Sequence, residues 1–125
     1  MTTINQQTTT NVFNYIRGAI RSAYGVEDLS EKSILFVGMG TFSQEILKRF
    51  CNSRASIYFI SDSLMEYYSA YTVCEMINPY GGEAVDIIVD VDKNILTVNG
   101  KLRFLGKIDE GVVDAYTQGI HDFYL

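Results

Sequence analysis

The sequence has no tryptophan, one proline, one histidine and two cysteines among its 125 residues. A single histidine and two widely spaced cysteines, Cys51 and Cys74, provide neither a zinc-ligand spacing nor a CxxC redox motif, so we expect no metal site from them. Both cysteines lie among hydrophobic neighbours in segments with helical periodicity. This placement favours buried free thiols in a reducing compartment over a disulfide.

Clustered positive charge is also missing. The ten basic residues are scattered and are outnumbered by fifteen acidic ones, which gives a net charge of −5. Nucleic acid is therefore not an expected partner, because a sequence-independent grip on it needs clustered lysines and arginines. No apolar run approaches the roughly 20 residues of a membrane span, and residues 1–10 lack the basic and apolar stretches of a signal peptide. We expect a soluble, cytoplasmic protein with no membrane partner.

Apolar residues are present in the amount that one core requires. They make up 47% of the chain, with nine tyrosines and seven phenylalanines as the bulky side chains. A chain of this length fits one domain and leaves little room for a second. We expect residues 1–10 to form a flexible tail and residues 11–125 to form a single domain.

Helical and strand patterns alternate along that domain. Apolar spacing predicts helices over residues 11–24, 41–52, 64–78 and 109–123. Compact apolar runs predict strands over residues 33–37, 56–60, 84–91, 95–98 and 101–105. Asn99-Gly100 predicts a tight hairpin between the last two strands. The order predicts an α/β fold: a small Rossmann-like three-layer domain, with a mostly parallel sheet and a C-terminal β-hairpin at one edge.

Several residues mark the ends and faces of these helices. Asn11 has the side chain of an N-cap, and Gly25 is typical of a helix stop. Asp62 or Ser63 would cap the third helix. That helix is rich in tyrosine, and tyrosines at helical spacing are typical of a core or an interface.

A glycine turn directly follows the first predicted strand, with the sequence Gly38-Met39-Gly40-Thr41-Phe42-Ser43. In a dinucleotide-binding turn the first glycine allows the sharp bend from strand into helix. The second allows the backbone to approach a pyrophosphate at the helix N-terminus. Gly38 and Gly40 occupy these positions, and Thr41 and Phe42 begin the helix. Ser43 replaces the third glycine, which places a hydroxyl at the contact between helix and strand.

An acidic residue ends the next predicted strand. Asp62 follows Gly40 by 22 residues, the separation expected of the carboxylate that binds a ribose diol. No basic residue follows it closely, so a 2′-phosphate would lack a partner and NAD is favoured over its phosphorylated form. A purely structural interpretation stays open, in which the glycines make a tight turn and Asp62 caps the next helix.

The glycine turn and Asp62 belong to two longer stretches, LSEKSILFVGMG at residues 29–40 and FISDS at residues 59–63. They resemble the start of the cofactor domain of the glutamate/leucine/phenylalanine/valine dehydrogenase family, in which an L-x-x-K-x-V-x-V-x-G-x-G stretch precedes a strand that ends near Ser-Asp-Ser. The resemblance implies a Rossmann fold, with Gly38 and Gly40 under the pyrophosphate of NAD and Asp62 on the adenosine ribose. The family's catalytic Lys and Asp belong to a separate substrate domain, for which this chain has no room. The turn also resembles motif I of S-adenosylmethionine methyltransferases, which usually need a larger, seven-stranded sheet.

Other candidate groups are isolated. His121 is the only histidine, and we expect it at the surface or at a helix end. Asp90 and Asp92 place two carboxylates on one face of a strand end, but a Mg²⁺ site needs further ligands. We therefore assign no catalytic and no metal-binding residue.

Two functions of different classes stay open. The first is a small nucleotide-binding protein, with an NAD-type dinucleotide as the expected ligand and without a complete catalytic machinery. Its cofactor-binding residues would be Gly38, Gly40, Thr41, Phe42 and Asp62. The second is a degenerate Rossmann-fold scaffold with a structural or protein-interaction role. In either case a sheet covered by few helices leaves apolar faces, so we expect a homo-oligomer or a protein partner.

Overall fold

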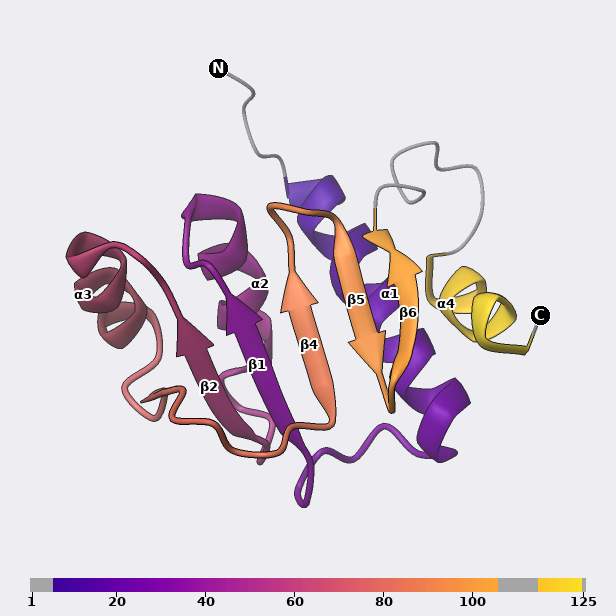
Figure 1. Cartoon of the computed structure of the whole chain (residues 1–125). Coiled ribbons are helices and arrows are strands. Elements are labelled where there is room, and N and C mark those ends of the chain that lie inside the picture. The colour runs from indigo at the N-terminus through magenta and orange to yellow at the C-terminus, as the bar shows by residue number, and fades with distance from the viewer. Residues whose placement is uncertain (1–5, 106–114, 125) are drawn as a thin grey trace.

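The computed structural model describes residues 6–105 and 115–124. Helices and strands alternate through most of this part of the chain (Figure 1). In chain order the elements are α1 (Gln6–Tyr24), β1 (Ser33–Val37), α2 (Thr41–Phe50), β2 (Ser56–Ile60), α3 (Leu64–Val73), β3 (Asn78–Pro79), β4 (Ile87–Asp90), β5 (Ile95–Val98), β6 (Lys101–Phe104) and α4 (Ala115–Tyr124). None of the described helices is long and apolar enough to cross a membrane.

The described strands form one sheet in the order β3-β2-β1-β4-β5-β6. The pairings among β3, β2, β1 and β4 are parallel, and the β4–β5 and β5–β6 pairings are antiparallel. Asn99 and Gly100 both have positive φ, 50° and 79°, as the predicted hairpin turn requires. The α/β class, the mostly parallel sheet and the hairpin at one edge are therefore confirmed.

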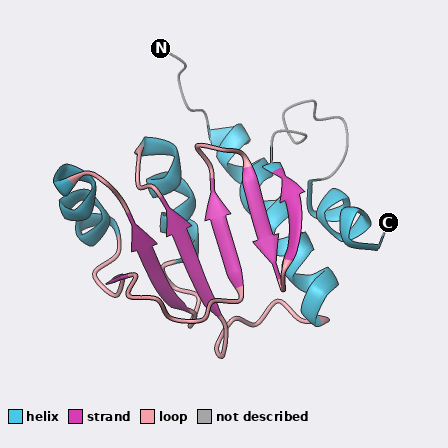
Figure 2. Ribbon diagram, in the orientation of Figure 1, coloured by secondary structure: helices cyan, strands magenta, loops and turns pink. Residues whose placement is uncertain are grey.

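The helices gather on one side of this sheet (Figure 2). Alternate strand residues point to that side and join apolar helix residues in one buried cluster. Phe36 contacts Phe50 of α2, and Phe59 contacts Tyr67 of α3, with ring centroids 6.4 and 4.6 Å apart. The described residues thus form two layers and not the three expected, because the connection from β3 to β4 contains no helix to cover the second face.

The other side of the sheet, which we call the open sheet face, is not covered by any described helix. Its apolar residues include Leu35, Ile60, Ile88, Ile95, Leu102 and Phe104; of these, Ile60, Leu102 and Phe104 are exposed, whereas Leu35 is buried. Their pairing places them side by side: Leu35 is in register with Ile88, and Ile95 with Phe104. Phe104 is 55% exposed and Leu102 49% exposed. Since sheets with parallel strands are normally covered on both faces, this surface is unusually apolar for one facing solvent.

The N-terminal helix begins earlier than predicted. It starts at Gln6, so the second half of the expected tail is helical and Asn11 lies inside the helix instead of capping it. Tertiary contacts explain the difference, because Thr9 is fully buried and Thr10 accepts a 3.0 Å hydrogen bond from Arg49 of α2. Residues 1–5 lie outside the described residues.

Other boundaries differ less. The third helix ends at Val73, not at residue 78, because Asn78 and Pro79 pair with β2 as a short strand. The strand predicted from residue 84 begins at Ile87. Gly25 ends α1 with φ of 76°, and Ser63 is the N-cap of α3, both as predicted. The start predicted for the last helix, residues 109–114, lies outside the described residues.

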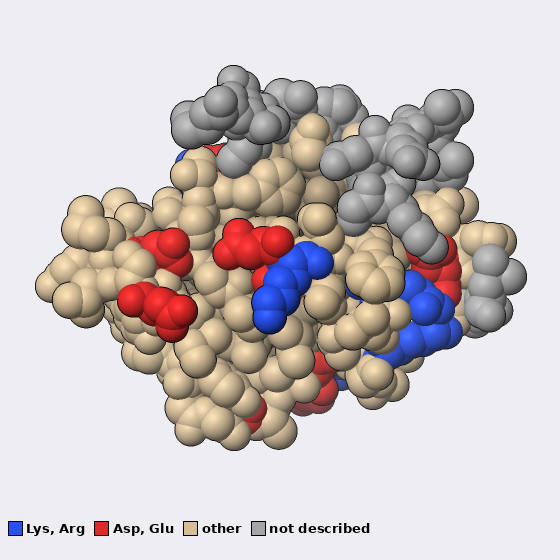
Figure 3. Space-filling model, turned by 45° about the horizontal axis from the view of Figure 1, so that its top comes forward, with Lys and Arg blue, Asp and Glu red and all other residues tan. Residues whose placement is uncertain are grey.

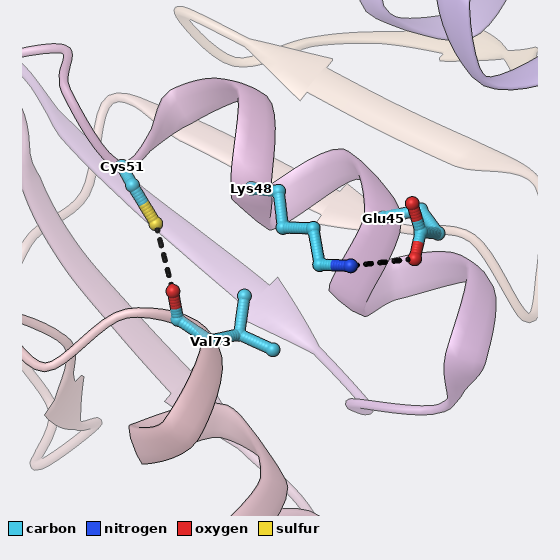
Figure 4. A network of polar contacts seen from close by, with 4 residues as sticks. All are labelled: Glu45, Lys48, Cys51 and Val73. Carbon is cyan, nitrogen blue, oxygen red and sulfur yellow. Dashed lines mark hydrogen bonds and ion pairs between the residues drawn. The ribbon is translucent and has the colours of Figure 1, made fainter. Parts of the chain in front are cut away.

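The C-terminal ends of α2 and α3 meet beside two free cysteines. Cys51 Sγ donates a 3.4 Å hydrogen bond to the carbonyl oxygen of Val73, one residue before Cys74, while Glu45 and Lys48 pair along the exposed side of α2 (Figure 4). Burial, and then a hydrogen bond with Cys74, raise the pKa of Cys51 to about 12. The Cys51 thiol is therefore neutral near pH 7 and a weak nucleophile.

Candidate functional site

A hollow of about 410 Å³ lies at the carboxyl ends of β1, β2 and β4. It is lined by Val37, Gly38, Ile60, Ser61, Asp62, Ser63, Glu66, Asp90, Asp92 and Lys93. β1 and β4 are neighbours in the sheet. After the carboxyl end of β1 the chain continues to β2 on one side of this pair, and after the carboxyl end of β4 it continues to β5 on the other side. The hollow therefore lies at the switch point of the sheet, where ligands of open α/β folds characteristically bind.

Gly38, the first residue of the glycine turn, lines the hollow. Gly38 has φ of 79°, a left-handed conformation that favours glycine, and its N–H donates to the carbonyl oxygen of Ile60 at 2.7 Å. Gly40 has an ordinary φ of −71° and begins α2 without a side-chain cap. A methyl group on Gly40 would meet nothing within 4 Å. The first glycine is thus required by the backbone, whereas the second leaves open space at the helix N-terminus.

The third position of the glycine pattern is filled tightly. Ser43 is 1% exposed and lies in the first turn of α2. Met39, the residue between the two glycines, is fully buried. Met39 and Ser43 of the turn are therefore packed into the protein interior.

Glu66 bridges the turn to the end of β2. Its Oε1 accepts a 2.8 Å hydrogen bond from the Met39 N–H and a 2.6 Å hydrogen bond from Ser61 Oγ. Ser61 Oγ accepts in turn from the Ser63 N–H at 3.1 Å. One backbone N–H group of the glycine turn, that of Met39, thus already donates a hydrogen bond to a carboxylate of α3.

Asp62 and Asp92 face the hollow from opposite sides. Asp62 follows β2 and is exposed, while Ser63 Oγ accepts the 3.4 Å capping bond from the Glu66 N–H. The capping role that Asp62 shared in the structural interpretation thus belongs to Ser63. Asp92 comes from the turn after β4, and its Oδ2 lies 2.8 Å from the point where a Cβ on Gly38 would be.

The hollow is acidic. Asp90 is 9% exposed and accepts a hydrogen bond from the Lys93 N–H at 3.1 Å. Asp62, Glu66, Asp90 and Asp92 line the hollow, and Lys93 is the one basic residue among its described lining residues. Figure 3, turned so that this edge comes forward, shows acidic side chains gathered over it. Within the described residues, no group of three or more His, Cys, Asp or Glu side chains could hold a metal ion.

The structure brings together only part of the predicted set. Gly38 and Asp62 line the hollow, whereas Gly40, Thr41 and Phe42 lie at the start of α2 and are not among its lining residues. His121 is exposed in the last turn of α4, as expected, and does not line the hollow.

Glu66 and Asp92, the two carboxylates that lie close to the glycine turn, were not assigned to this site from the sequence. Glu66 stands three residues after Ser63, a spacing that predicts a capping box in which the glutamate bonds back to the serine N–H. In the structure that N–H bonds to Ser61 instead, and the Glu66 carboxylate reaches the glycine turn. The sequence places Asp92 beside Asp90 at a strand end, but its closeness to Gly38 depends on the pairing of β4 with β1.

Comparison with known proteins finds a likeness of fold. L-tryptophan dehydrogenase from Nostoc punctiforme superposes with a TM-score of 0.58 and 14% sequence identity, over 66% of this chain and 26% of that chain. No protein-family model matches the chain, and no curated protein matches it. The described structure therefore has a Rossmann-like α/β fold similar to part of an amino acid dehydrogenase, in agreement with the resemblance seen in the sequence.

Proposed function

We propose that the hollow binds a nucleotide, with NAD as the first candidate, and that this chain offers a binding site without catalytic machinery of its own. The observation that carries the proposal is that Gly38 and Asp62, from the ends of two neighbouring strands, line the same hollow at the switch point of the sheet. The fold likeness to a dehydrogenase supports a nucleotide as the class of ligand. We also propose a cytoplasmic setting, which suits the two free cysteines.

The residues of the candidate site fit the adenosine ribose of NAD better than its pyrophosphate. Asp62 is exposed at the end of β2, where its carboxylate can accept hydrogen bonds from the adenosine ribose diol. Gly40, Thr41 and Phe42 would offer the N-terminus of α2 to the pyrophosphate. One donor of the turn, the Met39 N–H, already bonds to Glu66. NAD supplies hydride chemistry when bound, and we assign no described side chain to a step of it.

The test is nucleotide binding by the Asp62→Asn variant. We expect calorimetric titration of the wild type with NAD or adenosine to show binding, and Asp62→Asn to weaken it by about tenfold to a hundredfold, because a charged acceptor of the diol is lost. Glu75→Gln is the matched control, since it removes the same charge from an exposed residue that does not line the hollow. Absence of binding and of thermal stabilisation by NAD, NADP, S-adenosylmethionine and ATP at millimolar concentration would rule the proposal out.

A second candidate function is that of an interaction scaffold. The observation that favours it is the open sheet face, whose apolar residues no described helix covers. The outer side of α3 adds exposed apolar residues, with Leu64 at 75% and Tyr68 at 70%. A scaffold would self-associate or hold a protein partner and would keep that behaviour when Asp62 is replaced. Sedimentation of wild type and Asp62→Asn distinguishes this function from one that depends on the nucleotide.

A further inference from the structure

The glycine turn already holds a negative charge from its own chain. In a turn that binds pyrophosphate, the backbone N–H groups are left for the phosphate oxygens. Here the Met39 N–H donates to Glu66 Oε1 at 2.8 Å. The carboxylate of α3 therefore takes a position that a phosphate oxygen would need.

Glu66 is held in this position from two directions. Its backbone is fixed in the first turn of α3, where its N–H donates to Ser63 Oγ. Its carboxylate also accepts the 2.6 Å bond from Ser61 Oγ. Moving the side chain out of the hollow breaks both carboxylate bonds, so an incoming phosphate has to displace an internal anion that is already well bonded.

A second carboxylate reaches the same turn from a different element. Asp92 is an exposed residue of the turn after β4, and its Oδ2 lies 2.8 Å from the Cβ position of Gly38. Among the described residues that line the hollow, Lys93 is the one basic residue against Asp62, Glu66, Asp90 and Asp92, so the carboxylates are in excess. A phosphate placed against Gly38 would meet like charges on both sides, whereas a neutral or positively charged group would not.

We propose that Glu66 and Asp92 determine the ligand class of the hollow, selecting nucleosides whose 5′ group is neutral or cationic over those that carry a phosphate or pyrophosphate. The inference rests on the proposed function, because it takes the hollow to bind the nucleoside part of such a ligand, with Asp62 on the ribose. It narrows that function: the adenosine part of NAD carries its affinity, and the pyrophosphate opposes it.

The experiment compares four probes on one ribose: adenosine, 5′-amino-5′-deoxyadenosine, AMP and NAD. We expect wild type to bind the amino compound and adenosine about tenfold or more tightly than AMP or NAD at low salt, as the cost of a like charge at close range implies. Glu66→Gln keeps an amide oxygen that can accept from Met39 and Ser61 but removes the charge. It should tighten AMP and NAD binding by about tenfold while changing adenosine affinity by less than about twofold.

Two further variants make the result specific. Asp92→Asn should shift the same preference in the same direction, and it carries the test if Glu66→Gln does not fold. Glu75→Gln removes an equal charge outside the hollow and should leave the order of the probes unchanged.

The outcomes separate the two proposals. Wild type that binds NAD more tightly than adenosine, with no change in Glu66→Gln or Asp92→Asn, overturns the ligand class while the nucleotide site stands. An equal shift in Glu75→Gln assigns the effect to overall charge and also overturns it. If no probe binds wild type or either variant, the nucleotide site itself is wrong, and the ligand class falls with it.

Discussion

At the residue scale, Tyr15 of α1 and Asp122 of α4 form a buried hydrogen-bonded pair between the two helices. Tyr15 is fully buried, and its hydroxyl donates to Asp122 Oδ2 at 2.6 Å, while Gln118 donates to the other oxygen at 2.9 Å. Tyr15→Phe leaves the buried carboxylate one bond short. We expect the free energy of unfolding, measured in urea, to fall by about 1–3 kcal/mol. Tyr68→Phe, at an exposed position, should change it by less than about 0.5 kcal/mol.

The same contact makes this stability depend on pH. Burial above all, and then the hydrogen bond and charge of Asp122, raise the pKa of Tyr15 above its ordinary value of 10.0. Near pH 10 the unfolded chain loses this proton and the folded chain keeps it, so the contribution is complete below that pH and is lost above it. The advantage of wild type over Tyr15→Phe should therefore shrink from about pH 9 to pH 11. A constant difference across that interval would contradict the assignment.

At the element scale, α4 packs against α1 through two glycines. A Cβ on Gly18 would lie 2.0 Å from the carbonyl oxygen of Tyr116, and one on Gly119 would lie 2.3 Å from that of Tyr15. Both obstacles are backbone atoms, so Gly18→Ala has to push the helices apart. We expect a loss of about 1–3 kcal/mol in thermal unfolding, despite the better helix propensity of alanine. Gly40→Ala is the control, because its Cβ would meet nothing within 4 Å, and a loss of equal size there would refute the packing argument.

The sequence predicts elements better than contacts between distant elements. The strands that carry Phe36 and Phe59 are short apolar runs between polar residues, so their bounds and the glycine turn follow from local pattern. The contact of α1 with α4 joins Tyr15 to Asp122, which are 107 residues apart in the sequence. From the sequence alone, Gly18 and Gly119 at this contact indicate only a low helix propensity. Glu66 shows the same limit, because its spacing from Ser63 predicts a helix cap but not the turn that its carboxylate reaches.

At the scale of the whole molecule, the helices cover one face of the sheet and the candidate site lies along one edge. The expectation of apolar faces followed from counting few helices for the number of strands, and the open sheet face agrees with it. Which face stays open could not be predicted from the sequence. The apolar residues Leu35 and Phe36 are neighbours in β1 and point to opposite sides, and only the placement of α2 decides which one it buries.

The open sheet face predicts self-association of two copies through that face. It extends over β2, β1, β4, β5 and β6, roughly 20 Å at about 4.8 Å per strand, which suits a small, reversible interface. We expect a dimer in sedimentation at roughly 50 μM, and a monomer when Leu102→Glu and Phe104→Glu are combined, because burying the two carboxylates without partners opposes association.

Met76→Glu is the matched control for that dimer. It places the same charge at an apolar residue that is 76% exposed, follows α3 and is not one of the residues of the open sheet face. The control should remain dimeric. A wild-type monomer at this concentration would exclude the interface. If Met76→Glu separates the copies and the β6 double variant does not, then the copies meet beside α3, and the open sheet face is not their contact.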